Sequence, residues 1–359
     1  MYFHPLNFIR FILALGVVLF HYGILFYPFN SGNLHTLIVN SSFRVSFFFF
    51  ISGFVMMLVY GPQAENLKAS EFYKKRLTRI LPMYWLAFII TLMLLVLLLG
   101  SGPKGLVIII HFFGLQSFYS GYVLDLNYPA WSISVELFFY SVFPFLMRWM
   151  FSLSMRRLLI FSVALWLLQS LQHILFVDYL WNGTKPMEEF ISDFPLWHLV
   201  TFIAGMTSAR IVLRNYTMIR VQFFAPFLFL VSLALFAYII FIPNPFLKYV
   251  HNGLLCPLFA LLIVSLFYDR SVIHRFLSQP AISKLGDLSY GLFIFQYPVW
   301  IICNRVATDS FITSSYFFLI YLLVLITFAW VINRYVERPI LQLLRKKLVK
   351  DSPQEVKAL

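Results

Sequence analysis

The chain has 359 residues, of which 61% are hydrophobic and 20% aromatic, while only 11% are charged. A soluble domain carries about 25% charged residues, so a soluble globule of this size is excluded. The net charge of +13 would indicate nucleic-acid binding in a soluble protein. In a membrane protein such an excess first reports topology, so no nucleic-acid partner is expected. The two cysteines indicate neither a disulfide framework nor a metal site.

Apolar stretches of about 20 residues recur along the chain and predict an all-α, polytopic membrane helix bundle. Because they are continuous rather than alternating, a membrane β-barrel is excluded. A further stretch, Gly105–Tyr119, is short and interrupted by polar residues, so we expect a re-entrant or interfacial segment there. The ten predicted spans are Leu6–Phe26, Phe43–Tyr60, Ile80–Leu99, Trp131–Trp149, Leu158–Val177, Phe194–Leu213, Val221–Ile242, His251–Tyr268, Gly286–Cys303 and Ser315–Tyr335.

The positions of the basic residues predict the orientation. With the amino terminus in the cytoplasm, 21 of the 27 basic residues fall in inner loops, five fall in outer loops, and Arg10 lies within a span. This asymmetry favours ten spans with both termini in the cytoplasm. We therefore expect one transmembrane domain over residues 1–340, followed by a basic cytoplasmic tail over residues 341–359.

Few ionisable residues lie inside the predicted spans, and Arg10, His21 and Glu136 are the clearest. Each costs about 2.5–3.5 kcal/mol on insertion scales and so requires a partner or a function. Arg10 and His21 are 11 positions apart, roughly 20° beyond three full turns, so they share one helix face about 16 Å apart. Alone, Arg10 can be an interfacial arginine and His21 a structural histidine. Their shared face favours a functional role for both.

Glu136 and His21 each lie five residues inside the outer end of a predicted span, so their depths match. A carboxylate and an imidazole at one depth can form a base and its orienting partner, which activates a hydroxyl nucleophile. Ser132 and Ser134 lie within about one helical turn of Glu136 and are candidates for binding substrate or satisfying the carboxylate. The sequence alone does not establish that the two helices are adjacent.

A basic cluster precedes the third predicted span, and its members Arg76 and Arg79 lie three residues apart on nearly the same helix face. Such clusters are most often topology signals or contacts with anionic lipids. Together with Arg10 at similar depth, these arginines would instead form a cytoplasmic phosphate pocket, because arginine binds phosphate in a planar, bidentate way.

These residues resemble the integral-membrane acyltransferase family 3, whose members transfer acyl groups, commonly acetyl, to sugars of cell-surface polysaccharides and related acceptors. The resemblance covers nearly the whole chain. It rests on the spacing from Arg10 to His21 and on the strings FFFISGF at 48–54, RLTRILPMY at 76–84, WSISVELFFY at 131–140, LGDLSY at 285–290 and ERP at 337–339. Two positions depart from the family pattern. Many members have a histidine in the string before Pro298, where this chain reads FQYP with Gln296, and many have an acidic residue where it has Ser46.

The resemblance implies transfer from cytoplasmic acyl-coenzyme A, with acetyl-coenzyme A as the expected donor, by an enzyme of the bacterial inner membrane. Arg10, Arg76 and Arg79 would then lie on the coenzyme side, and His21 near the chemistry, with Glu136 or a nearby serine orienting it. The expected acceptor is a hydroxyl of a cell-surface polysaccharide or lipid-linked sugar, and membrane lipid surrounds the protein. No metal is expected. Candidate substrate-binding residues are Ser52, Trp131, Ser132, Ser134, Tyr290 and Gln296.

Several alternatives stay open at this stage. Gln296 can bind the acceptor or the thioester carbonyl, but an interhelical hydrogen bond is the favoured role. Transfer can be direct or pass through an acylated residue. The acceptor can also be a lipid, peptidoglycan or a small molecule. The rival class is a non-enzymatic exporter of a lipid-linked sugar or organic anion, in which His21 relays protons. The sequence lacks the repeated halves that such carriers often show.

Overall fold

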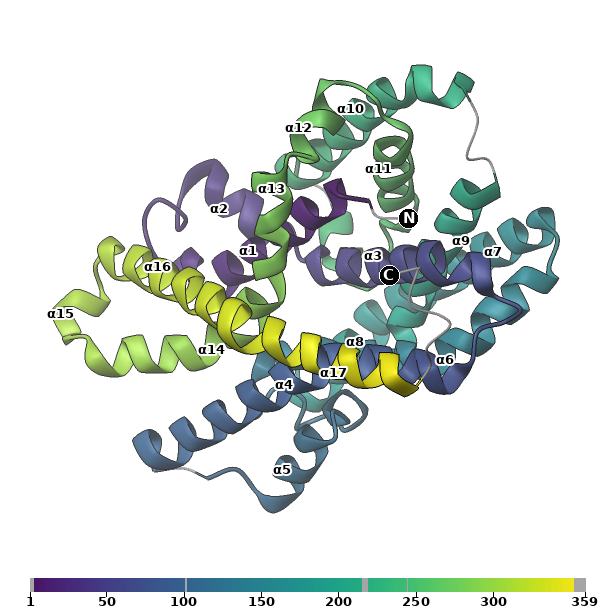
Figure 1. The fold of residues 1–359 in the computed structure, drawn as a ribbon. Helices are drawn as coiled ribbons and strands as arrows, with labels where there is room; N and C mark the ends of the chain where they lie inside the picture. Colours follow the sequence, from purple (N-terminus) through teal and green to yellow (C-terminus); the bar gives the residue numbers. More distant parts are fainter. Residues whose placement is uncertain (1–2, 101, 215–218, 244, 352–359) are drawn as a thin grey trace.

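The computed structural model describes residues 3–100, 102–214, 219–243 and 245–351, and within these ranges the regular structure is entirely helical (Figure 1). Short 3₁₀ and π-helical turns connect or extend the α-helices. The α-helices are α1 Pro5–His21, α2 Gly32–Val39, α3 Arg44–Tyr60, α4 Ala69–Leu99, α5 Gly105–Phe112, α6 Trp131–Ser152, α7 Met155–Leu175, α8 Lys185–Asp193, α9 Pro195–Arg214, α10 Ile219–Phe241, α11 Cys256–Tyr268, α12 Val272–Leu277, α13 Pro280–Leu285, α14 Ser289–Val306, α15 Asp309–Ile312, α16 Ser315–Ile332 and α17 Arg338–Asp351.

The predicted helix bundle is confirmed, but the predicted count of ten spans is not. Within the described ranges, seven helical segments are long and apolar enough to cross a membrane. An eighth is a pair bent by 65°, in which the turn η6 (Pro245–Asn252) precedes α11. Each of the other two predicted spans does contain a helix. However, α1 has only 17 residues, because the chain leaves the helix at His21, and α14 carries the polar residues Gln296 and Arg305 within its 18.

The short apolar stretch Gly105–Tyr119 does not form a full span. It consists of α5, a turn at Gly114 with φ +67°, and the 3₁₀ turn η3 over Gln116–Phe118. The segment is held against α4, where the Trp85 indole donates to the Phe112 carbonyl at 3.0 Å. Whether it is re-entrant or interfacial stays a prediction.

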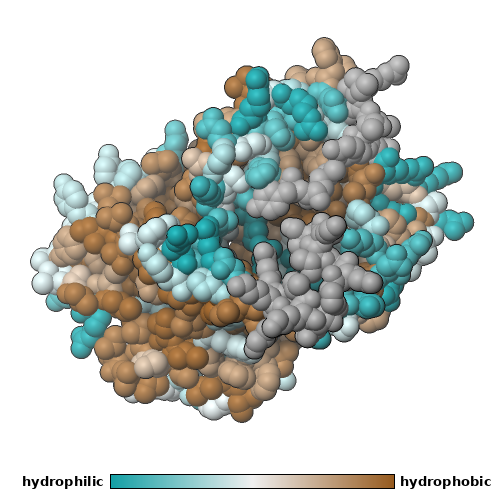
Figure 2. All heavy atoms as spheres, in the orientation of Figure 1, coloured by the Kyte–Doolittle hydropathy of each residue, from teal (hydrophilic) through white to brown (hydrophobic). Residues whose placement is uncertain are grey.

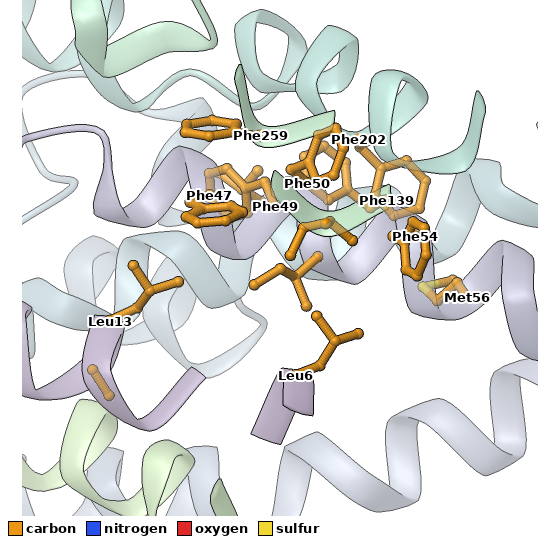
Figure 3. Packing of buried hydrophobic residues seen from close by; sticks show 14 of the residues in the cluster. Leu6, Leu13, Phe47, Phe49, Phe50, Phe54, Met56, Phe139, Phe202 and Phe259 are labelled. Carbon is orange, nitrogen blue, oxygen red and sulfur yellow. The ribbon is translucent and has the colours of Figure 1, made fainter. Parts of the chain in front are cut away.

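Helix α3 lies in the middle of the bundle, and its phenylalanines form much of the core (Figures 1 and 3). Phe47 stacks on Phe259 of α11 with ring centroids 4.4 Å apart. Phe49 meets Phe139 of α6 edge to face at 5.2 Å, and Phe139 in turn stacks on Phe202 of α9 at 4.5 Å. The phenylalanines of α3 therefore pack on α11 and α6, and Phe139 extends the cluster to α9.

Helices α3 and α9 pack tightly against each other at two glycines. A Cβ atom at Gly53 would lie 2.1 Å from the Phe202 carbonyl oxygen, and one at Gly205 would lie 2.0 Å from the Phe50 carbonyl oxygen. Small residues at helix crossings let the backbones pack together, as is common in membranes. Gly53 is thus required by packing, which explains one position of the FFFISGF string without assigning it a catalytic role.

Apolar side chains also cover much of the outside. Figure 2 shows hydrophobic residues over the lower part of the molecule, where α4 and α5 lie in the same view of Figure 1. Exposed side chains there include Met93 and Leu97 of α4 and Ile109 of α5. Exposed apolar area on this scale is incompatible with water and is typical of a lipid-facing surface. The protein is an integral membrane protein.

At the carboxyl end, α16 and α17 are joined by the π-helical turn η8 (Asn333–Glu337) into one long helical segment, drawn in yellow (Figure 1). The boundary predicted at residue 340 falls within α17. Residues 352–359 of the predicted basic tail lie outside the described residues. The division into a membrane domain and a tail stays a prediction.

Candidate active site

Helix α1 carries Arg10 in its second turn and His21 as its last residue. The Arg10 guanidinium lies close enough to interact electrostatically with Arg79, Arg76 and Glu136. His21 instead makes a hydrogen bond to Gln296 of α14. One helix therefore connects two different groups of side chains, which its rise separates by about 16 Å.

The hydrogen bonds around Gln296 determine which nitrogen of His21 carries the proton. The Gln296 amide nitrogen donates to the Phe293 carbonyl at 2.7 Å, so its oxygen Oε1 is the atom that faces His21. The His21 Nδ1 atom lies 2.8 Å from that oxygen. Because an amide oxygen only accepts, Nδ1 must donate. A neutral His21 then has its lone pair on Nε2, where it can accept a proton.

Aromatic rings line the same end of α1. The Tyr128 ring meets the His21 imidazole edge to face, with centroids 4.8 Å apart, and the Phe20 ring lies 5.6 Å away. His21 Nε2 makes no hydrogen bond to a described residue, yet it is not among the fully enclosed unpaired polar atoms. The atom that can accept a proton is thus unpaired and not completely enclosed.

At the other end of α1, three arginines gather without salt bridges. Among the described residues, none of the ion pairs within 4.0 Å includes Arg10, Arg76 or Arg79. Arg76 is buried, and its guanidinium lies over the rings of Tyr60 and Tyr140 at 5.1 and 5.8 Å. Its Nε atom is enclosed and has no hydrogen-bond partner. Grouped guanidinium groups that form no salt bridge favour binding of a polyanion.

Glu136 belongs to this arginine group. Its Oε1 atom accepts hydrogen bonds from the hydroxyls of Tyr140 at 2.7 Å and Ser52 at 3.2 Å. Tyr140 therefore contacts both charged groups: its hydroxyl donates to Glu136, and its ring lies beneath the Arg76 guanidinium. Ser52, a predicted substrate-binding residue, is a partner of Glu136 here.

The structure does not form the expected pair of His21 with Glu136, since within the described chain each has other hydrogen-bond partners. Their equal depth follows from the ends of apolar runs; α6 does begin at Trp131 as predicted, but the outer end of the first run is not the end of α1. The first run continues to Phe26, but α1 ends at His21. Gln296 supplies the orienting contact that was expected from Glu136 or a nearby serine.

The comparisons with known proteins identify the family. The family model described as an acyltransferase domain, that of integral-membrane acyltransferase family 3, matches residues 3–334 of the 359. The chain belongs to acyltransferase family 3. Neither the curated proteins nor the solved structures gave a match. Membership makes the protein an acyltransferase, and the resemblance found from its motifs is confirmed.

In this acyltransferase the two carboxyl-terminal motifs meet at the arginine end of α1. Arg338 of the ERP string forms an ion pair with Asp287 of the LGDLSY string at 2.7 Å. Glu337 interacts electrostatically with Arg79 and Arg10. A Cβ atom at Gly286 would lie within 2.7 Å of the Asn7 backbone, so this glycine allows the LGDLSY turn to pack on α1.

The remaining predicted substrate-binding residues have contacts within the acyltransferase. The Tyr290 hydroxyl donates to the Ile80 carbonyl at 3.0 Å, which joins α14 to α4. Ser132 donates to the Pro129 carbonyl, and Ser134 accepts from the Ser117 backbone. The Trp131 ring packs against His198 at 5.4 Å. These contacts stabilise the bundle and the start of α6, and a role in substrate binding stays a prediction for all four.

Sequence reasoning missed three residues that the fold brings to these groups. Tyr140 and Glu337 lie at the arginine end, and both stand in strings already singled out, so their position in a motif was the available signal. Arg44 lies near His21, and in the predicted topology it is only one of the five basic residues on the outer side. No group of three histidine, cysteine or acidic residues that could hold a metal occurs in the described ranges.

Proposed function

We propose that this acyltransferase moves an acyl group, expected to be acetyl, from cytoplasmic acyl-coenzyme A to a hydroxyl of a cell-surface polysaccharide or lipid-linked sugar. We place it in the bacterial inner membrane with both termini cytoplasmic. The single observation that carries the mechanism is the arrangement on α1. Arg10 lies at one end among arginines that form no salt bridge within the described residues, and His21 has an unpaired Nε2 at the other.

On the donor side, Arg10, Arg76 and Arg79 bind the phosphates of acyl-coenzyme A. Charge-assisted bonds from guanidinium to phosphate are stronger than neutral hydrogen bonds, and several together discriminate a polyphosphate from a neutral ligand. Glu136, which accepts from Tyr140 and Ser52, positions the arginine group rather than reacting. From this pocket the pantetheine arm extends along α1 and brings the thioester to His21.

On the acceptor side, His21 Nε2 takes the proton from the acceptor hydroxyl as general base. The hydroxyl oxygen attacks the thioester carbonyl, a carbon–oxygen bond forms, and the carbon–sulfur bond breaks as the tetrahedral intermediate collapses. The departing thiolate takes the proton from His21. Gln296 keeps Nδ1 protonated and thereby keeps Nε2 available for this cycle. A double transfer through an acylated residue uses the same two sites.

The acceptor class is tested by surface glycans of the source bacterium. Deletion of the gene is expected to remove ester-linked acyl groups detected by mass spectrometry, and the wild-type chain or Arg156→Gln is expected to restore them. Arg156 is exposed on α7, makes none of the contacts described for the site, and serves as the control. His21→Ala is expected not to restore them. Glycans that are unchanged by the deletion would exclude this acceptor class, and transfer with His21→Ala would exclude the mechanism.

The rival exporter is distinguished in detergent, where no gradient exists. An acyltransferase is expected to bind acyl-coenzyme A and release coenzyme A when an acceptor is added. An exporter is expected to do neither. Membership in the acyltransferase family supports the first outcome.

A further inference from the structure

A buried cation lies near His21 and has no role in the mechanism above. Arg44 is the first residue of α3 and is only 7% exposed. Its guanidinium makes no hydrogen bond or ion pair with any residue that the structure describes. No acidic residue occurs in the first turn of α3. Buried arginines are normally paired, so the missing partner requires an explanation.

The side chain of Arg44, from α3, packs against α1, the helix that carries His21. Its Cδ atom would be 2.7 Å from a Cβ atom at Gly16, so the aliphatic part of the side chain rests on α1 where a glycine leaves room. One turn further along α1, the guanidinium lies over the Phe20 ring at 5.2 Å. It is also near enough to interact electrostatically with His21. Arg44 thus belongs to the histidine end of α1.

Two features make this position suited to an anion. The amino terminus of α3 adds the positive end of its helix dipole to the charge of Arg44. In addition, the guanidinium is not sealed off. The Nε atom of Arg76 is unpaired and completely enclosed by other atoms, whereas no side-chain nitrogen of Arg44 is completely enclosed in this way. The cation beside the proposed catalytic base is therefore buried and unpaired but not completely enclosed.

We propose that Arg44 binds a carboxylate or phosphate group on the acceptor and so holds the acceptor hydroxyl next to His21 Nε2. The inference rests on the proposed function and defines its acceptor as an acidic sugar or sugar phosphate. The donor phosphates have their own arginines at the opposite end of α1. In the predicted topology, Arg44 faces the side on which surface glycans are found. Arg44 carries a permanent positive charge. Such a charge suits an acceptor anion that is present throughout binding better than the short-lived oxyanion of the tetrahedral intermediate.

The test uses purified protein with acetyl-coenzyme A and three probes: methyl glucuronoside, glucose 1-phosphate and methyl glucoside. Coenzyme A release is measured for each. We expect a lower KM for at least one of the two acidic probes than for methyl glucoside. Comparison of the two identifies carboxylate or phosphate as the preferred group. Arg44→Gln is expected to raise KM for the preferred acidic probe about 10- to 100-fold and leave kcat within a few-fold. Arg44→Lys is expected to retain part of the preference.

The matched control is Arg305→Gln, because Arg305 is an exposed arginine at the predicted outer end of α14. It is expected to leave all three KM values unchanged. Equal use of acidic and neutral probes by the wild type would overturn the inference. So would an equal fall in kcat for all three with Arg44→Gln, which would make Arg44 an oxyanion donor. Failure of the proposed function is recognised separately, because His21→Ala would then release coenzyme A as fast as the wild type.

Discussion

The two ends of α1 carry related chemistry in different surroundings. At the Arg10 end, three arginines share the field of Glu136 and Glu337 without salt bridges. At the His21 end, one imidazole is fixed by a single amide and edged by aromatic rings. Grouped arginines suit binding of a polyphosphate, whereas an imidazole whose Nδ1 is held by one amide suits proton transfer at Nε2. Substitutions at the two ends should therefore affect different steps.

The largest expected effect is at His21. His21→Ala removes the general base and should lower kcat for acyl transfer by about 10²- to 10⁴-fold, while the Kd for acyl-coenzyme A stays within a few-fold. Kinetics of coenzyme A release and titration calorimetry measure the two quantities. His35→Ala, which changes a histidine of α2, is the control and should be active. If His21→Ala weakened acyl-coenzyme A binding as much as it lowered kcat, the two ends of α1 would not have separate roles.

Gln296 should have the next largest effect, because it determines the protonated nitrogen of His21. Gln296→Leu removes the acceptor for Nδ1–H and should lower kcat by about 10²-fold, near the lower limit for general base catalysis. Gln296→Glu keeps an acceptor oxygen and should retain activity to within about tenfold. If Gln296 had only a structural role, both variants would lower kcat equally. The kcat values of the two variants therefore distinguish positioning of His21 from a purely structural role.

Substitutions at the arginine end of α1 should weaken the binding of acyl-coenzyme A. Arg10→Gln removes one charge-assisted contact to phosphate and should raise the Kd for acyl-coenzyme A about 10- to 100-fold. At saturating donor, kcat should change little. Arg156→Gln serves again as the control. If Arg10→Gln lowered kcat at saturation and left the Kd unaltered, the phosphates would have to bind elsewhere.

The smallest expected effect concerns the scaffold on which both ends depend. Gly53→Ala places a methyl group against the Phe202 carbonyl and should destabilise the bundle by about 1–3 kcal/mol through overpacking. Thermal unfolding of the purified protein measures this. Gly105→Ala, where a Cβ atom meets nothing within 4 Å, should leave the unfolding temperature unchanged. Equal stability of the two variants would mean that α3 and α9 can separate without cost.

The sequence by itself determined the class of the fold and which residues deserved attention. Continuous apolar runs require spanning helices, because lipid cannot satisfy an exposed backbone. The spacing of Arg10 and His21 determined their shared face, because the pitch of an α-helix is fixed. Motif order indicated the family, which the family model confirmed.

Only the tertiary structure decided which side chains meet. Glu136 was expected beside His21 because depth was counted along apolar runs, but helix ends and packing placed Gln296 there. Arg44 carried no local signal, since it begins a span like any outer basic residue, and its burial comes from the glycine opposite it on α1. The contact of His21 with Gln296 and that of Gly16 with Arg44 each join two helices that are separate in sequence. The periodicity of one segment does not encode which other helix it packs against.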